Sequence, residues 1–130
     1  CIMQGVHLPG ALLKPNMILP GNNNSEEITR KNIAELTIEC LSKHVPKEIP
    51  GIVFLSGGQS DEDATAHLNI MNKMDIKQPW ELSFSYGRAL QAEALKEWAV
   101  GTAESSQQSF LKRAEMNHKA RSGEWAEELE

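Results

Sequence analysis

Three short apolar runs, each followed by a pattern typical of a helix, constrain the fold of this chain more than any other feature. The runs end near residues 14, 55 and 85, and apolar residues then recur at helical spacing. Such alternation predicts parallel strands that are joined by right-handed crossovers. We therefore expect an α/β chain with the element order β-α-β-α-β-α-α.

The boundaries of these elements follow from capping residues, turn formers and prolines. Ser25 and Ser60 suit N-cap positions, because acidic residues that favour the start of a helix follow each of them. His67 is expected on the solvated side of its helix, and residues 122–130 are expected to fray. We expect strands at residues 6–14, 52–55 and 80–85, a loop at 75–79, and helices at 26–44, 61–73, 88–98 and 104–121, the last with Phe110, Leu111 and Ala114 facing inward.

Composition excludes several classes of protein. The chain has 130 residues and a net charge of −5, which suits one small domain and argues against a nucleic-acid-binding protein. Cys1 and Cys40 are too few for a disulfide framework, which indicates a reducing compartment. No apolar run reaches the length of a transmembrane helix, so no membrane partner is expected. The chain begins with Cys rather than Met, and we interpret this start as a cut edge.

Lys14 stands at the end of the first apolar run, directly before Pro15. A lysine in an apolar run either extends its ammonium group to the surface or takes part in chemistry. Pro15 ends regular structure there, which places Lys14 at the C-terminal end of a strand. Catalytic side chains of (β/α)8 barrels occupy that position. An ordinary surface lysine at a strand edge is the alternative.

Two further segments at strand ends are suited to binding an anion. Ser56-Gly57-Gly58 follows the second strand and precedes a helix, so its backbone N–H groups can hold a phosphate. Tyr86-Gly87-Arg88 follows the third strand, and a guanidinium at the start of a helix offers two donors to one phosphate. The alternatives are a tight turn without a ligand and a surface ion pair of Arg88.

Three segments closely resemble motifs of the class I fructose-bisphosphate aldolase family. They are Gly10-Ala11-Leu12-Leu13-Lys14-Pro15-Asn16-Met17, Phe54-Leu55-Ser56-Gly57-Gly58-Gln59-Ser60 and Phe84-Ser85-Tyr86-Gly87-Arg88-Ala89-Leu90-Gln91, in the family's order. The resemblance extends from about Gly5 to about Arg113. It implies the C-terminal part of a (β/α)8 TIM barrel, about strands 6–8 and the helices that follow. Residues 1–121 would belong to the barrel and residues 122–130 to the start of a C-terminal tail.

The resemblance also implies an activity and its site. Lys14 matches the family's Schiff-base lysine, which would cleave fructose 1,6-bisphosphate reversibly to dihydroxyacetone phosphate and glyceraldehyde 3-phosphate in glycolysis and gluconeogenesis. A neutral amine can attack the ketone, and the resulting iminium polarises the substrate, so neither a metal ion nor a cofactor is required. The residues that match the family's phosphate-binding positions are Ser56, Gly57, Gly58, Ser85, Gly87 and Arg88.

The chain departs from the family's pattern in several places. The family has an acidic residue where this chain has Pro9, so we expect the strand before Lys14 to differ. The family's general acid/base glutamate and second active-site lysine would lie upstream of Cys1, and its C-terminal tyrosine is absent from this chain. The resemblance thus implies a fragment that is poorly folded and inactive alone. The longer enzyme would be a homotetramer of the cytoplasm, or of a plastid, and would bind a sugar phosphate.

Two alternatives use the same motifs. A different Schiff-base lyase would keep the lysine and the phosphate site but act on another sugar phosphate. A non-catalytic relative would bind a sugar phosphate as a scaffold without forming an adduct. Lys14→Arg separates an enzyme from a scaffold, because the substitution keeps the charge but prevents the imine.

Overall fold

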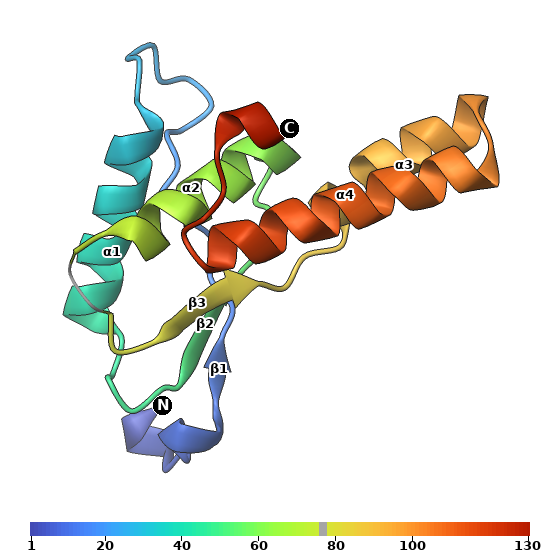
Figure 1. Ribbon diagram of the computed structural model, residues 1–130. Helices are drawn as coiled ribbons and strands as arrows, with labels where there is room; N and C mark the ends of the chain where they lie inside the picture. The colour runs from blue at the N-terminus through green and yellow to red at the C-terminus, as the bar shows by residue number, and fades with distance from the viewer. Residues whose placement is uncertain (76–77) are drawn as a thin grey trace.

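A parallel three-stranded sheet organises the computed structural model, which describes residues 1–75 and 78–130 (Figure 1). The strands are β1 (Leu12–Leu13), β2 (Gly51–Phe54) and β3 (Glu81–Phe84), and β2 lies between the other two. Both pairs of strands are parallel. The expected α/β chain with parallel strands is therefore confirmed.

Helices follow each strand in the expected order. They are α1 (Arg30–His44) after β1, α2 (Asp61–Lys73) after β2, and α3 (Arg88–Val100) and α4 (Ala103–Arg121) after β3. Short 3-10 helices lie at Ile2–Gln4, Leu8–Gly10 and Glu127–Leu129. The predicted span of α2 is confirmed, and its N-cap Ser60 accepts the Asp63 N–H through Oγ at 3.0 Å. Residues 76 and 77 of the loop expected at 75–79 lie outside the described residues.

The strand expected at residues 6–14 is wrong over most of its length. Leu8–Gly10 forms a 3-10 helix with Pro9 in its first turn, and only Leu12–Leu13 pairs with β2. Proline has no N–H to donate to a sheet, and its fixed φ suits the first turn of a helix. The departure at Pro9 thus shortens the strand that leads to Lys14.

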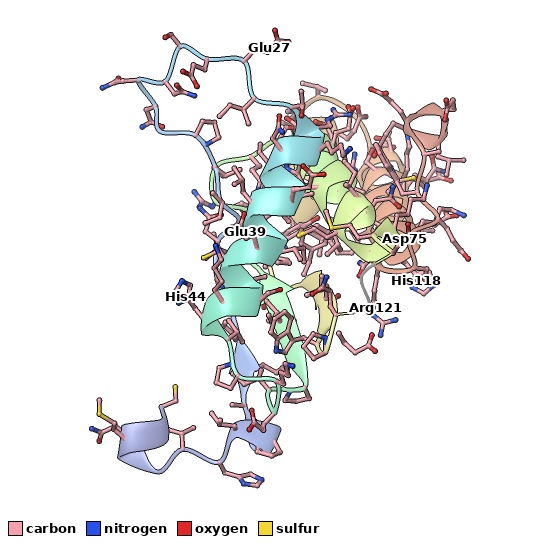
Figure 2. All side chains as sticks on the ribbon, turned by 90° about the vertical axis from the view of Figure 1, so that its left-hand side faces the viewer. Glu27, Glu39, His44, Asp75, His118 and Arg121 are labelled. Carbon is pink, nitrogen blue, oxygen red and sulfur yellow. The ribbon has the colours of Figure 1, made fainter. Side chains whose placement is uncertain are left out.

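Helix α1 begins at Arg30, so the expected N-cap at Ser25 is also wrong. Thr29 is the N-cap: its Oγ1 accepts the N–H of Asn32 at 3.2 Å, and Asn32 Oδ1 accepts the N–H of Thr29 at 3.3 Å. This reciprocal pair satisfies two N–H groups that a helix start leaves unpaired. Ser25 lies instead in the exposed loop that extends beyond α1, where Glu27 is labelled in Figure 2.

The helices cover one face of the sheet and form the core with it. Ile52, Phe54 and Leu82 are buried on that face. Because side chains alternate along a strand, Val53 and Ser83 lie on the opposite face, where they are only half-buried. The helices supply the rest of the core with Ile33, Ala34, Ile38 and Leu41 of α1, Ala66, Leu68 and Met71 of α2, and Met116 and Ala120 of α4.

Helices α3 and α4 form a hairpin that projects beyond the sheet (Figure 1). The expectation that Phe110 and Leu111 face inward is wrong, since they are 39% and 68% exposed; Ala114 is half-buried. The buried residues of α4 are Arg113, Met116 and Ala120, at intervals of three and four.

Residues 122–130 pack onto the helices, so the expected fraying is wrong. Trp125 is 5% exposed, and its backbone N–H donates to Asn69 Oδ1 at 3.0 Å. The carboxylate of Glu130 accepts two hydrogen bonds from Arg113, each 2.8 Å long. The boundary between a barrel portion and a tail after residue 121 stays a prediction.

Candidate functional site

Lys14 directly follows β1, at the C-terminal end of that strand. Leu13 pairs in register with Ile52, and the Leu55 N–H donates to the Pro15 carbonyl at 3.1 Å, so the chain runs beside β2 on both sides of Lys14. Alternation along the strand therefore places Lys14 on the face of the sheet opposite Ile52, away from the helices. The side chain of Lys14 is exposed.

Residues 56–59 form a tight turn between β2 and α2. Gly57 and Gly58 have φ of +60° and +86°, and the Gln59 N–H donates to the Ser56 carbonyl at 3.0 Å. Two consecutive positive φ angles across such a bond are typical of a type I′ turn. Within residues 1–75 and 78–130, no acceptor pairs with the backbone N–H of Gly57 or Gly58. Both N–H groups are therefore free to hold an anion.

The loop after Lys14 contacts this turn. A Cβ atom at Gly57 would lie 2.0 Å from Asn16 Oδ1, so a glycine is required for the two loops to approach this closely. Asn16 Oδ1 also accepts the Met17 N–H at 2.9 Å. The C-terminal ends of β1 and β2 thus meet through Asn16 and Gly57.

The third predicted segment lies at the start of α3. Gly87 is the N-cap and Arg88 is the first helical residue, while the N–H of the exposed Ser85 donates to the Phe54 carbonyl at 2.9 Å. Arg88 is exposed and has no ion-pair partner in the described part of the chain. The surface ion pair considered for Arg88 is therefore not formed there, and its guanidinium is free to bind an anion.

The predicted site residues line three hollows rather than one. The first, with a volume of about 520 Å³, is lined by Lys14, Ser85 and Gly87. The second is lined by Ser56, Gly58 and Arg88, and the third by Gly57 and Gly58 together with Asn16 and His67. The structure thus brings Lys14 together with Ser85 and Gly87. In the part of the chain that the structure describes, Lys14 shares no hollow with Ser56, Gly57, Gly58 or Arg88.

Tyr86 and Asn117 also belong to this region, although the sequence analysis named Tyr86 only as part of a segment and predicted no role for either residue. The Tyr86 hydroxyl donates to Asn117 Oδ1 at 2.8 Å, and the Tyr86 ring meets the edge of Phe84 with centroids 4.3 Å apart. Burial raises the pKa of Tyr86 to about 12, so the hydroxyl keeps its proton and its bond. This bond fixes the Ser85–Gly87 loop against α4. Nothing in the spacing of the sequence indicates Asn117, which lies 31 residues from Tyr86.

His67 is buried, so its expected solvated position is wrong. It is 3% exposed, and its ring Nδ1 lies 2.6 Å from Gln59 Oε1. Helix α2 packs against both α1 and α4, and six consecutive residues of it, Ala64–Asn69, are buried. A helix covered on both sides has no solvated face at its centre, so the solvated side expected for His67 does not exist there.

The described residues contain neither a metal-binding cluster nor a membrane-spanning helix. Among residues 1–75 and 78–130, no three His, Cys, Asp or Glu side chains are grouped so that they could hold a metal ion. None of the described helices combines the length and the hydrophobic character that spanning a bilayer requires.

Comparison with known proteins identifies relatives over nearly the whole chain. The family model described as fructose-bisphosphate aldolase class-I matches residues 1–130. Fructose-bisphosphate aldolase A of Salmo salar is 48% identical over 122 residues, and cytosolic fructose-bisphosphate aldolase 5 of Arabidopsis thaliana is 50% identical over 122 residues. Each alignment covers 92% of this chain and 34% of the relative. The chain therefore spans about a third of the length of these curated relatives.

A solved structure agrees with these relatives. Fructose-bisphosphate aldolase from Plasmodium falciparum, in a ternary complex with TRAP and a small molecule inhibitor, matches with a TM-score of 0.85 and 45% sequence identity. The match covers 94% of this chain and 35% of that chain, and it confirms the expected part of a (β/α)8 barrel. By sequence and by fold, this chain belongs to the class I fructose-bisphosphate aldolase family.

Proposed function

We propose that this chain supplies the Schiff-base lysine and the phosphate site of an aldolase that cleaves fructose 1,6-bisphosphate. One observation carries the proposal: in a member of the aldolase family, all three predicted site segments lie at the C-terminal ends of adjacent parallel strands. Ligands of open and closed α/β sheets bind at that end of the strands. The reversible products would be dihydroxyacetone phosphate and glyceraldehyde 3-phosphate.

Lys14 is the catalytic residue of this proposal. Its neutral amine attacks the ketone carbon of the substrate, and loss of water from the carbinolamine gives an iminium. The iminium accepts electrons from the C3–C4 bond, which breaks to release the aldehyde and leave an enamine. Protonation of the enamine and hydrolysis of the regenerated iminium return dihydroxyacetone phosphate and free Lys14.

The phosphate site would orient the ketone toward Lys14. The unpaired N–H groups of Gly57 and Gly58 and the unpaired guanidinium of Arg88 support this role. Hydrogen bonds from backbone N–H groups and from arginine are the usual means of holding phosphate. The remaining proposed ligands are Ser56, Ser85 and Gly87.

The rest of the proposal concerns the whole protein. Lys14 is exposed in this chain, whereas an amine nucleophile becomes neutral when burial or a neighbouring cation disfavours its charge. We propose that the remaining two thirds of the relatives' length encloses Lys14 and supplies the general acid and base. We also propose a homotetramer in the cytoplasm, in line with matched plant relatives that are named cytosolic and cytoplasmic.

Imine trapping tests the proposal on the protein that carries this sequence. Dihydroxyacetone phosphate is added, the imine is reduced with borohydride, and the modified peptide is mapped by mass spectrometry. We expect the adduct on Lys14, its loss together with turnover in Lys14→Arg, and neither loss in the control Lys47→Arg, which alters an exposed loop residue.

Two results would contradict the proposal in different ways. Binding of the phosphate without an adduct would leave only a sugar-phosphate-binding scaffold. An adduct on Lys14 without cleavage of fructose 1,6-bisphosphate would indicate a Schiff-base lyase for another sugar phosphate.

A further inference from the structure

His67 and Gln59 connect α2 to the turn at residues 56–59, which we call the glycine turn because Gly57 and Gly58 lie at its centre. The ring Nδ1 of His67 lies 2.6 Å from Gln59 Oε1, and Gln59 Nε2 donates to the Ser56 carbonyl at 3.1 Å. The same carbonyl accepts the backbone N–H of Gln59 at 3.0 Å. One side chain therefore adds a second hydrogen bond across the turn that holds Gly57 and Gly58.

The direction of each hydrogen bond follows from the Ser56 carbonyl. A carbonyl only accepts, so the amide group of Gln59 that faces Ser56 must be its NH2. The group of Gln59 that faces His67 is then its oxygen, which also only accepts. His67 must therefore carry a proton on Nδ1 and donate it to Gln59 Oε1.

The other ring nitrogen of His67 is Nε2. Nε2 is buried and forms no hydrogen bond in the described part of the chain. Burial lowers the pKa of His67, with a raising effect from Asp63 on α2 and a further lowering one from Arg30 on α1. The lowered pKa favours a neutral ring, and the hydrogen bonds place the single proton of that ring on Nδ1.

We propose that His67 is a positioning residue for the phosphate site: it orients Gln59, and Gln59 holds the turn that presents the N–H groups of Gly57 and Gly58 to phosphate. The proposal rests on the proposed function for its ligand, the phosphate, but the contact between His67 and Gln59 does not depend on that function. His67 lies in α2 and is not among the residues proposed to bind the substrate. It acts only through the Gln59 amide.

Amide hydrogen exchange tests the contact without relying on any activity. In the full-length protein that carries this sequence, His67→Phe keeps an aromatic ring but removes the Nδ1–H. We expect the Gln59 N–H to exchange roughly two- to tenfold faster, the effect of losing one neutral hydrogen bond. The N–H groups of α2 should exchange as before, and the control His44→Phe, at the exposed end of α1, should change neither (Figure 2). An unchanged rate at Gln59, or an equal rise throughout α2, would overturn the proposal.

Gln59→Leu removes the hydrogen bond between Gln59 and His67 by changing the half-buried Gln59 instead of the buried histidine. It replaces His67→Phe in the test if that variant does not fold. Both variants should raise KM for the sugar phosphate roughly two- to tenfold while leaving kcat near that of the parent protein. A loss confined to kcat, or an unchanged KM in Gln59→Leu, would overturn the positioning role. If the parent protein itself forms no imine and binds no sugar phosphate, the proposed function fails, and amide exchange still decides whether His67 holds the turn.

Discussion

Gly57 lies where two loops of the site meet, and the structure leaves no room there for a side chain. Its φ is +60°, and an added Cβ atom would lie 2.0 Å from Asn16 Oδ1. The neighbouring Gly58 has a similar backbone, with φ of +86°, but among the described residues no atom beyond its chain neighbours lies within 4 Å of its Cβ position. The two glycines therefore separate the cost of a left-handed backbone from the cost of displacing Asn16.

Gly57→Ala should lower the free energy of unfolding by about 3 kcal/mol, and Gly58→Ala by about 1 kcal/mol. Both variants carry the left-handed strain, but only Gly57→Ala must also break the hydrogen bond from the Met17 N–H to Asn16 Oδ1. Urea unfolding of the protein that carries this sequence measures both values. Equal losses in the two variants would show that the approach of Asn16 does not matter.

His67 also predicts how stability depends on pH. Its folded pKa is lowered from 6.5 by burial, so the unfolded state binds more protons while the pH lies between 6.5 and the lowered pKa. The free energy of unfolding should therefore decline as the pH falls from 6.5 through the lowered pKa. Burial would raise the pKa of Asp63, but hydrogen bonds from Ser60 and Arg30 outweigh it and hold that pKa below 3.8, in a separate window.

In His67→Phe this part of the decline should be absent, because no imidazole remains to be protonated. Urea unfolding at pH 7 and pH 5 gives the comparison, and His44→Gln, which changes an exposed histidine, is the control. A parent protein and a His67→Phe variant with the same pH dependence would contradict the buried neutral ring.

At the scale of elements, the sequence predicts the ends of helices and strands well where a local capping residue determines them. Helix α2 was predicted to the residue, because Ser60 supplies a cap that the structure uses. The start of α1 was missed because Ser25 and Thr29 both suit a cap, and only the partner Asn32 distinguishes them. The strand predicted before Lys14 was too long, because the prediction followed the apolar residues and gave too little weight to Pro9.

The candidate site likewise has a part that local sequence predicts and a part that depends on the packing of helices. The sequence predicted that Lys14, the glycine turn and Arg88 each follow the end of a strand. Because parallel strands bring their C-terminal ends to one edge of a sheet, the three segments were expected at the same edge. The contact of Tyr86 with Asn117 and that of His67 with Gln59 depend on how helices pack. Side chains in such contacts come from different elements, so no local pattern reveals them.

The cap of α1 gives a prediction with a matched control. Thr29→Ala should lower the free energy of unfolding by about 1 kcal/mol, because it removes the acceptor of the Asn32 N–H. Ser25→Ala should leave the free energy unchanged, since Ser25 lies in the exposed loop before the helix. Chemical unfolding of the two variants tests this, and a loss in Ser25→Ala as large as that in Thr29→Ala would show that Ser25 also caps the helix.

At the scale of the whole molecule, the sheet is covered by helices on one face only. Parallel sheets are normally buried on both faces, and unpaired edge strands tend to associate with other chains. Within the described residues, β1 and β3 each have one neighbouring strand, and Leu12 of β1 is 65% exposed. The 130-residue chain on its own therefore combines two open edges with an uncovered face on which the apolar side chain of Leu12 is exposed.

We expect this chain, prepared alone, to self-associate, to bind a hydrophobic dye and to lack aldolase activity. Leu12→Glu places a charge on the uncovered face, so it should reduce both association and dye binding. Leu36→Glu places the same charge at an exposed position of α1 and should change neither by a comparable amount. Sedimentation velocity and dye fluorescence measure the two effects. A chain that is monomeric, unfolds cooperatively and cleaves fructose 1,6-bisphosphate would contradict this view, because its open face would then need no covering.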